Sequence, residues 1–240
     1  YTAEAIKDFL VRAGVAKADS VVDTAMLEHC LREDLNAHAY RMMAVLDPIK
    51  VVIENWPEDR FEEVEIENLP GSPEAGTRTV RFGRELYIER EDFRLKPEGE
   101  VRLKGAYIVK CERWETDETG RVTTVYCTYD PATKSGECER KVKGTLHWLC
   151  APDAVPAEFR LYEPLMEDAG EDDARDFIER LNPASLCVQR GFVEPALAEA
   201  APGDRFQFMR VGYFCADLDH KKEAPVFNRA VGLKDSFKVN

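Results

Sequence analysis

The chain begins with a pattern that predicts two amphipathic helices. In residues 2–13 apolar side chains recur at helical spacing on one face, with Thr2 as N-cap and Gly14 at the end. A second helix is predicted over 19–36, where apolar residues recur in the same way. Two helices of this size cannot bury a core between them, so we expect them to dock on a further part of the protein, most naturally one that precedes Tyr1.

From residue 45 onward the pattern changes to one of short strands. Ile49, Val51 and Ile53 alternate with residues of the opposite face, and a hairpin is predicted from strands 101–114 and 122–129 around a turn at 116–120. Many short strands without long helices between them indicate a mainly β fold of barrel or sandwich type. Further strands are predicted at 61–66, 77–88, 141–150, 156–162, 188–193, 206–210, 213–217 and 226–233.

Charge limits the partners that this protein can have. The net charge of −13 argues against a general nucleic-acid binder. The acidic residues are concentrated, however, because 54–67 holds seven acids and one base and 163–180 holds eight acids and two bases. Residues 78–113 hold ten bases and seven acids, so a basic face is expected opposite the two acidic segments. Such a face would need specific contacts, since charge alone would not hold nucleic acid.

Neither a catalytic centre nor a metal site is predicted. The seven cysteines are scattered without a Cys-x-x-Cys pair, which is typical of reduced thiols in a cytosolic protein. Cys111 and Cys127 are equidistant from the predicted turn at 117–120 and are expected to face each other across the hairpin as core residues. No glycine-rich phosphate loop is present, His147 beside Trp148 is expected to be a packed strand residue, and the apolar runs are too short to cross a membrane.

Candidate chemistry lies in the aromatic stretch 205–215. Gln207 and Arg210 stand between aromatic residues on two predicted strands, and both side chains can hydrogen-bond to base edges. They are three residues apart, which puts them on opposite faces of a regular strand, so a turn or bulge near 209–212 would have to bring them together. Arg102 and Lys104 instead alternate with apolar neighbours and share one exposed face.

The wording of this stretch resembles the C-terminal end of glutaminyl-tRNA synthetases, where it lines a pocket for the tRNA anticodon. The resemblance extends over nearly the whole chain. Many long matching segments in the same order are more specific than one short motif. It includes Arg32-Glu33-Asp34-Leu35-Asn36, Asp92-Phe93-Arg94, Glu100-Val101-Arg102-Leu103, Phe206-Gln207-Phe208 with Arg210 and Gly212-Tyr213-Phe214-Cys215, and Pro225-Val226-Phe227-Asn228-Arg229.

The resemblance implies two small β-barrels, proximal and distal, that follow a short α-helical subdomain. We place the helical subdomain at 1–43, the proximal barrel at 44–92 plus 185–240, and the distal barrel at 93–184. The ATP-binding signatures of the family are absent from this chain. The resemblance therefore implies that ATP and Mg²⁺ belong to an N-terminal catalytic domain outside it, and that this chain alone is inactive.

The resemblance also implies roles for individual residues. Arg41, Gln207 and Arg210 match family residues that contact the middle of the anticodon, and Arg102 matches an arginine beside its first base. Lys104 shares the exposed face of Arg102 and joins the expected tRNA-binding set. The remaining expected contacts are Asn36 near the anticodon stem-loop, Lys17 on the inner face of the tRNA, and Lys234 and Ser236, which stand where the family has arginine and threonine.

One departure and two alternatives accompany this interpretation. Only residues 95–99 remain where the family carries a longer segment that contacts the third anticodon base, so that base would fall to Arg94, Lys96 or Lys104. An archaeal- or eukaryotic-type glutamyl-tRNA synthetase shares the architecture, and a stand-alone β-barrel interaction module is the third possibility. The expected partners are glutamine tRNA and the catalytic domain of the same protein, in a cytoplasmic monomer without membrane contact.

Overall fold

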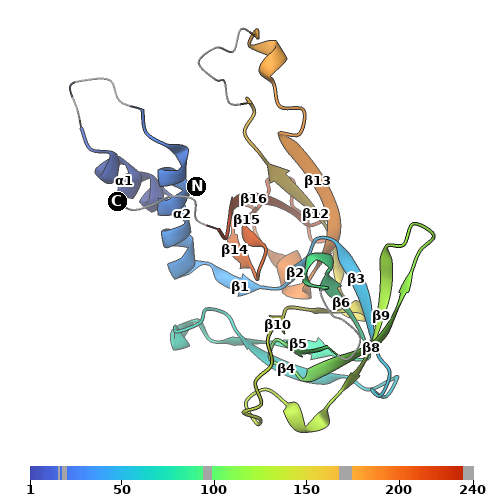
Figure 1. The fold of residues 1–240 in the computed structure, drawn as a ribbon. Helices are drawn as coiled ribbons and strands as arrows, with labels where there is room; N and C mark the ends of the chain where they lie inside the picture. Colours follow the sequence, from blue (N-terminus) through green and yellow to red (C-terminus); the bar gives the residue numbers. More distant parts are fainter. Residues whose placement is uncertain (16, 18–20, 94–98, 168–174, 235–240) are drawn as a thin grey trace.

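The protein is mostly β-structure with a short helical segment at its N-terminus, which confirms the predicted fold class (Figure 1). The computed structural model describes all residues except 16, 18–20, 94–98, 168–174 and 235–240. Two seven-stranded, barrel-like sheets and one two-stranded sheet contain the strands of the described residues. The helices lie against the first of the large sheets, and the second extends below it in the view of Figure 1.

The first predicted helix is confirmed, and the second is shifted along the chain. Helix α1 spans Ala3–Ala13, with the Thr2 hydroxyl accepting a hydrogen bond from the amide of Ala5 at 3.2 Å. Helix α2 spans Thr24–His38 and is capped by Asp23, so it begins after the predicted start and runs two residues beyond the predicted end. Asp19, Ser20 and Asp23 are all residue types that can cap a helix, so the local sequence does not decide where the helix begins.

The helices dock on a sheet of this same chain. The sequence had indicated a part that precedes Tyr1 as the most natural docking partner. Leu31 and Leu35 of α2 are buried in a cluster with Tyr213 and Val231. Each fully buried leucine contributes about 1.5–3 kcal/mol of hydrophobic stabilisation. The guanidinium of Arg32 adds a hydrogen bond from Nε to the carbonyl oxygen of Gly232 at 2.9 Å. The helical segment is thus fixed to the last strand of the sheet.

The first large sheet is built from two separate stretches of chain, 40–45 and 155–232, and we call it the split sheet. Its strand order is β1-β14-β15-β16-β12-β13-β2. Four phenylalanines, all fully buried, pack edge to face or stacked in its core: Phe159, Phe208, Phe214 and Phe227. Its strands are β1 (Tyr40–Met42), β2 (Ala44–Val45), β12 (Val155–Tyr162), β13 (Leu186–Val193), β14 (Arg205–Phe208), β15 (Gly212–Ala216) and β16 (Val226–Gly232).

The second large sheet comes from one unbroken stretch, 48–150, and we call it the continuous sheet. Its strand order is β10-β7-β8-β9-β3-β6-β11, and aromatic rings of Trp56, Phe82 and Trp148 fill its core. Its strands are β3 (Pro48–Ile53), β6 (Glu85–Glu89), β7 (Glu100–Leu103), β8 (Ile108–Thr116), β9 (Val122–Tyr129), β10 (Thr145–Leu146) and β11 (Leu149–Cys150), with β4 (Glu62–Glu67) and β5 (Thr77–Phe82) as a separate hairpin beside it.

Local predictions within the continuous sheet hold well. The alternation at Ile49, Val51 and Ile53 is confirmed, because all three side chains are buried. The hairpin of β8 and β9 is confirmed as well, and Cys111 pairs directly with Cys127 across it as two free thiols. The predicted strand 101–114 is instead two strands, since the chain turns at 104–107 between β7 and β8.

The strand pairing divides the chain at different places from those predicted. Strands β3 and β6, which we had expected in the proximal barrel, pair with each other and with β9 and β11. Strand β12, expected in the distal barrel, pairs with β13 and β16. The pairing therefore changes at 46–47 and 151–154, and the boundaries at 93 and 184 do not match it. Short strands carry no local signal for their partner, so the sequence alone does not give this pairing.

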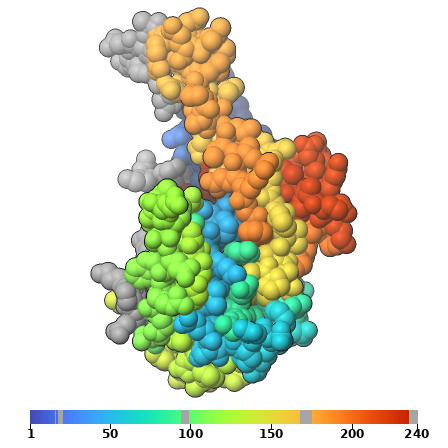
Figure 2. Space-filling model, turned by 90° about the vertical axis from the view of Figure 1, so that its right-hand side faces the viewer, coloured from blue at the N-terminus to red at the C-terminus, as the bar shows by residue number. Residues whose placement is uncertain are grey.

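The two large sheets meet at a tightly packed seam. Tyr87 of β6 stacks on Phe192 of β13, with ring centroids 4.5 Å apart. Where the chain crosses from one sheet to the other, the buried carboxylate of Glu89 accepts hydrogen bonds from the amides of Leu46 and Asp47. Gly191 lies so close to β2 that an added Cβ would be 2.1 Å from the nearest carbonyl oxygen. These contacts hold the sheets as neighbours, which Figure 2 shows as joined lobes below the projecting connection between β12 and β13.

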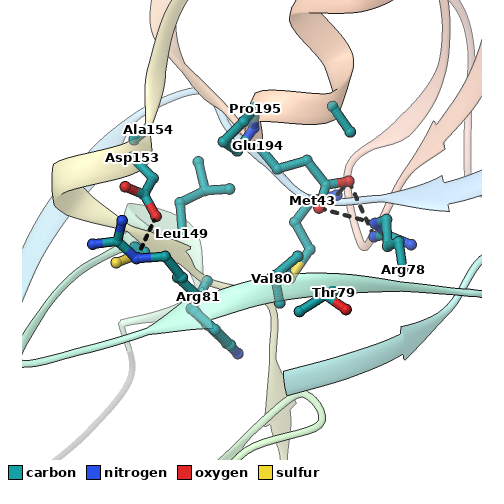
Figure 3. A pocket seen from close by; sticks show the side chains of 13 residues that line it. Met43, Arg78, Thr79, Val80, Arg81, Leu149, Asp153, Ala154, Glu194 and Pro195 are labelled. Atoms are coloured by element: carbon teal, nitrogen blue, oxygen red, sulfur yellow. Dashed lines mark hydrogen bonds and ion pairs between the residues drawn. The ribbon is translucent and has the colours of Figure 1, made fainter. Parts of the chain in front are cut away.

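A buried ion pair lies beside a cavity of about 220 Å³ at the same seam (Figure 3). Glu194 follows β13, and its carboxylate accepts from the amide of Met43 and from Nε of Arg78 on β5. The side chains of Glu194 and Arg78 are only 3% and 12% exposed. Arg78 also donates to Asn68 Oδ1, and the carbonyl of Asn68 accepts from the amide of Arg41. The ion pair is therefore connected to the first of the predicted site residues.

Candidate nucleic-acid interface

Two of the predicted base-reading residues lie side by side on neighbouring strands. Strand β1 runs parallel to β14, and its register places Arg41 directly beside Gln207. Because side chains on paired residues of a sheet point to the same face, both side chains project from one surface of the split sheet. Strand β1 follows directly on α2 (Figure 1). This pairing joins residues far apart in the sequence, and it gives an amide and a guanidinium on one rigid support.

Arg41 is held by the C-terminal end of helix α2. Its Nη1 donates to the carbonyl of Ala39 at 2.6 Å, and its Nη2 donates to the carbonyl and to Oδ1 of Asn36, each at 2.7 Å. Cations near the last carbonyls of a helix are stabilised there, so the arginine also caps α2. Burial lowers the pKa of Arg41, which nevertheless stays protonated because an arginine guanidinium is not deprotonated in proteins.

Gln207 belongs to a chain of hydrogen bonds that ends at Arg41. Its Nε2 donates to the hydroxyl oxygen of Tyr213 at 2.9 Å. The hydroxyl of Tyr213 in turn donates to Oδ1 of Asn36 at 3.4 Å, the same oxygen that accepts from Arg41. Tyr213 is only 4% exposed, and its ring packs against the helices. The structure thus brings Asn36, Arg41 and Gln207 together and adds Tyr213 to them.

Arg210 lies in the expected turn and has partners of its own. Strand β14 ends at Phe208, and Arg210 adopts φ 66°, a left-handed conformation that is unusual for a residue with a side chain. Its Nε donates to both carboxylate oxygens of Asp92 at 3.0–3.1 Å, and its Nη2 donates to one of them. Nη1 reaches the carbonyl of Thr145 at 3.4 Å. The turn of the split sheet is thereby tied to the continuous sheet.

Among the described residues, these bonds leave two N–H donors of Arg210 without a partner. A guanidinium carries five N–H groups, and the contacts to Asp92 and Thr145 use three of them. One N–H remains on each terminal nitrogen, on a side chain that is 49% exposed, while Asp92 is 10% exposed. A pair of parallel N–H groups is the arrangement with which arginine binds base edges bidentately. The hydrogen bond from Arg210 to the carboxylate of Asp92 raises the pKa of Arg210.

His147 lies next to this ion pair and is packed as expected, although it stands between β10 and β11 and not within a strand. It follows β10, is 1% exposed, and its Nδ1 is 3.8 Å from a carboxylate oxygen of Asp92. Burial lowers its pKa to about 4, although the charge of Asp92 opposes this. The imidazole is therefore neutral near pH 7. A neutral ring leaves the negative charge of Asp92 to Arg210.

Arg102 of β7 and Lys104, which follows that strand, are half-buried and line one shallow hollow of the continuous sheet. The guanidinium of Arg102 donates to the carbonyls of Thr133 and Arg140, so it also fastens the 130–140 loop. Arg102 is the register partner of Thr145, whose carbonyl accepts from Arg210. This pairing links the hollow to the Arg210 turn. Glu65 and Glu67 of β4 line the same hollow. Part of the acidic segment 54–67 therefore lies beside the basic residues, whereas the sequence predicted it on the opposite face.

The other predicted contacts come from separate parts of the chain. Lys17 lies between α1 and α2 and is exposed, and Lys234 follows β16 and is exposed as well. Ser236, Arg94 and Lys96 lie outside the described residues. Within the described ranges no cluster of three or more His, Cys, Asp or Glu side chains is arranged to hold a metal ion. No helix in the described part of the chain has the length and apolar character needed to cross a membrane.

Comparison with known proteins identifies the family of both sheets. The family described as class I tRNA synthetases (E and Q), anticodon-binding domain, matches residues 39–130, and a second family with the same description matches residues 145–217. This chain belongs to the class I tRNA synthetase anticodon-binding domains. The two matches together extend from β1 into β15, so this anticodon-binding region includes Arg41, Arg102, Gln207 and Arg210.

The relatives of this anticodon-binding region carry one name. A glutamine–tRNA ligase of Clostridium perfringens is 52% identical over the whole chain, which corresponds to 46% of that protein. A glutamine–tRNA ligase of Vibrio cholerae is 49% identical over 99% of the chain and 45% of that protein, and one of Nitrobacter hamburgensis is 51% identical over 98% of the chain and 44% of that protein. The chain thus spans a little less than half the length of these relatives.

Two residues that hold these side chains in place escaped prediction from sequence. From sequence, Asp92 is only part of a segment that resembles the family, and Tyr213 is only one aromatic residue of a predicted strand. The carboxylate of Asp92, which lies after β6, contacts Arg210 in the turn after β14, and no sequence spacing predicts that contact. Tyr213 did have a signal, because a tyrosine buried in a strand needs a hydrogen-bond partner for its hydroxyl.

Proposed function

We propose that the two barrels bind the anticodon arm of a glutamine tRNA, as part of a glutamine–tRNA ligase. The observation that carries the proposal is the pairing of Arg41 with Gln207 on β1 and β14, next to the open N–H pair of Arg210. Anticodon bases are single-stranded and can be splayed out, stacked and read along their edges. Fixed amide and guanidinium groups on strand ends are suited to that task.

The proposed contact residues divide into those that contact anticodon bases and those that contact the tRNA elsewhere. We infer that Gln207, Arg210 and Arg41 contact the middle anticodon base, and that Arg102 and Lys104 contact the neighbouring bases from their hollow. Glu65 and Glu67 in that hollow repel phosphates, which favours base edges over backbone there. Lys17, Asn36, Lys234 and Ser236 complete the set as contacts to the tRNA outside the middle base. The alternative of a module without RNA is not favoured, because the chain is similar to one half of longer ligases.

Binding of paired tRNAs tests the proposal. The chain should retain a glutamine tRNA at low salt more strongly than the same tRNA with its middle anticodon base changed. Replacing Gln207 or Arg210 by alanine should cost about 1–3 kcal/mol with the cognate tRNA and less with the altered one. Equal retention of both tRNAs by the unaltered chain would contradict the proposal.

The same assay separates glutamine from glutamate specificity. A glutamyl-type region would retain a glutamate tRNA at least as well as a glutamine tRNA, whereas our proposal requires the reverse order. Attachment of glutamine, with ATP and Mg²⁺, is then the task of a catalytic domain of the same cytoplasmic protein, and we expect that protein to be a monomer. Charging assays on the full-length protein and its sedimentation at several concentrations test these two expectations.

A further inference from the structure

The hydrogen bonds around Gln207 have a fixed direction, and Arg41 sets it. A guanidinium has donors and no acceptor, so the atom of Asn36 that faces Nη2 of Arg41 at 2.7 Å must be its oxygen. That oxygen also faces the hydroxyl of Tyr213, which therefore donates its single proton to Asn36. A hydroxyl that has donated its proton can only accept from its next neighbour.

The direction is passed on to Gln207. Tyr213 accepts from Gln207, so the nitrogen of the amide, and not its oxygen, faces the tyrosine at 2.9 Å. In the part of the chain that the structure describes, Oε1 of Gln207 accepts no hydrogen bond, and the side chain is half-buried on the surface next to Arg41. An unfixed amide would rotate and offer either atom, because its two ends differ little in shape.

We propose that Tyr213 is a positioning residue that holds the Gln207 amide with its oxygen outward, so that the site selects a base with an N–H donor facing Gln207. This inference rests on the proposed function. It assigns to a buried aromatic residue, which touches no base, a share in base selection. It also explains why the tyrosine hydroxyl is retained in a cluster that is otherwise apolar.

Uridine and cytidine distinguish the two amide orientations. Their rings have the same shape, but uridine offers N3–H as donor and O4 as acceptor, whereas cytidine offers N3 as acceptor and its amino group as donor. Where ring position 3 faces Gln207, an amide held with its oxygen outward accepts from the N3–H of uridine and opposes the lone pair on N3 of cytidine, whose amino donor lies at ring position 4. An amide free to rotate matches both, so loss of the tyrosine hydroxyl should mainly improve binding of the cytidine form.

The experiment measures the binding of two glutamine tRNA transcripts, with uridine or cytidine at the middle anticodon position, at one ionic strength. We expect the unaltered protein to prefer the uridine form by about tenfold or more. Tyr213→Phe should lower that ratio by about 3- to 10-fold, because a side chain that is no longer immobilised loses its orientation. Tyr107→Phe is the matched control, since Tyr107 is also buried and hydrogen-bonded, and it should leave the ratio unchanged.

A second pair of variants keeps the test valid if Tyr213→Phe folds poorly. Asn36 is exposed, so Asn36→Ala removes the acceptor of the tyrosine proton without opening the core, and it should also lower the ratio. Asn36→Asp keeps an acceptor oxygen for the tyrosine proton and should restore the ratio, even if its charge weakens the binding of both tRNAs equally. A ratio unchanged in both Tyr213→Phe and Asn36→Ala would overturn the inference.

The outcomes separate this inference from the proposed function. If the unaltered protein binds both transcripts equally, the proposed function itself fails. If it prefers uridine and Gln207→Ala abolishes the preference, while Tyr213→Phe and Asn36→Ala keep it, the proposed function stands and the role of Tyr213 is refuted.

Discussion

The buried ion pair between Arg78 and Glu194 should be the most sensitive point of the seam. Among the described residues, the carboxylate of Glu194 keeps only the amide of Met43 as a hydrogen-bond partner if Arg78 is replaced by methionine. Breaking a buried pair by removing one partner leaves a buried charge and typically costs about 3–5 kcal/mol. The lost contacts give a similar figure, because one hydrogen bond between charged groups is worth about 1.5–3 kcal/mol, and the 3.0 Å ion-pair contact of Nη2 of Arg78 with the carboxylate is lost as well.

The cost should depend on pH in a defined direction. Burial raises the pKa of Glu194, and the charge of Arg78 opposes that rise. Without Arg78 the pKa of Glu194 in the folded state rises further above its unfolded value, so the folded state binds the proton more tightly. Stability then falls as pH increases through that raised pKa. We expect the loss caused by Arg78→Met to be smaller near pH 5 than near pH 8 by about 1–2 kcal/mol.

Urea unfolding followed by circular dichroism at the two pH values measures this loss. Adding Glu194→Gln to Arg78→Met removes the buried charge and should recover part of the stability. Arg84→Met is the control, because the Glu58 partner of Arg84 is 77% exposed and such a pair is worth less than about 1 kcal/mol. An equal loss at both pH values, with no recovery in the double variant, would refute the reasoning.

Three further predictions concern single residues. Asp92→Asn should reduce the preference for the cognate middle base by up to about tenfold, and it should add nothing once Arg210→Ala is present, as a double-mutant cycle of tRNA affinities would reveal. Gly191→Ala should lower the free energy of unfolding by several kcal/mol, because its Cβ would lie 2.1 Å from a carbonyl oxygen of β2, whereas Gly144→Ala meets only an ordinary contact at 3.7 Å; thermal melts compare the two. Lys17→Ala should weaken all tRNAs alike and reduce the slope of log affinity against log salt by about one, which titrations at several salt concentrations measure.

The parts of the fold that local pattern controls were predictable. Thr2 and Gly14 bound the first helix as expected, because capping depends on residues within one turn of the helix end. The alternation at 49–53 predicted the buried face of β3, since side chains in a strand alternate between its two faces. The turn at 209–212 was required by the parity of Gln207 and Arg210, and the structure has it.

The choice of partners was not predictable from local pattern. The register that puts Arg41 beside Gln207 joins strands at opposite ends of the chain, and a strand of three residues carries no information about such a partner. The same holds for Asp92, whose contact with Arg210 crosses from one sheet to the other. Residue types therefore suggested what the site is able to do, while long-range pairing determined how each group is held.

The division into a continuous sheet and a split sheet sets an order of events during synthesis. Ribosomes release a chain from its N-terminus, and compact units fold as they emerge. All strands of the continuous sheet, within 48–150, are available before β14, the parallel partner of β1, has been made. Strands β1 and β2 therefore lack their partners β14 and β13 until those strands have been synthesised. We expect Arg41 to meet Gln207 only then, so the proposed tRNA surface is assembled only after β14 has been made.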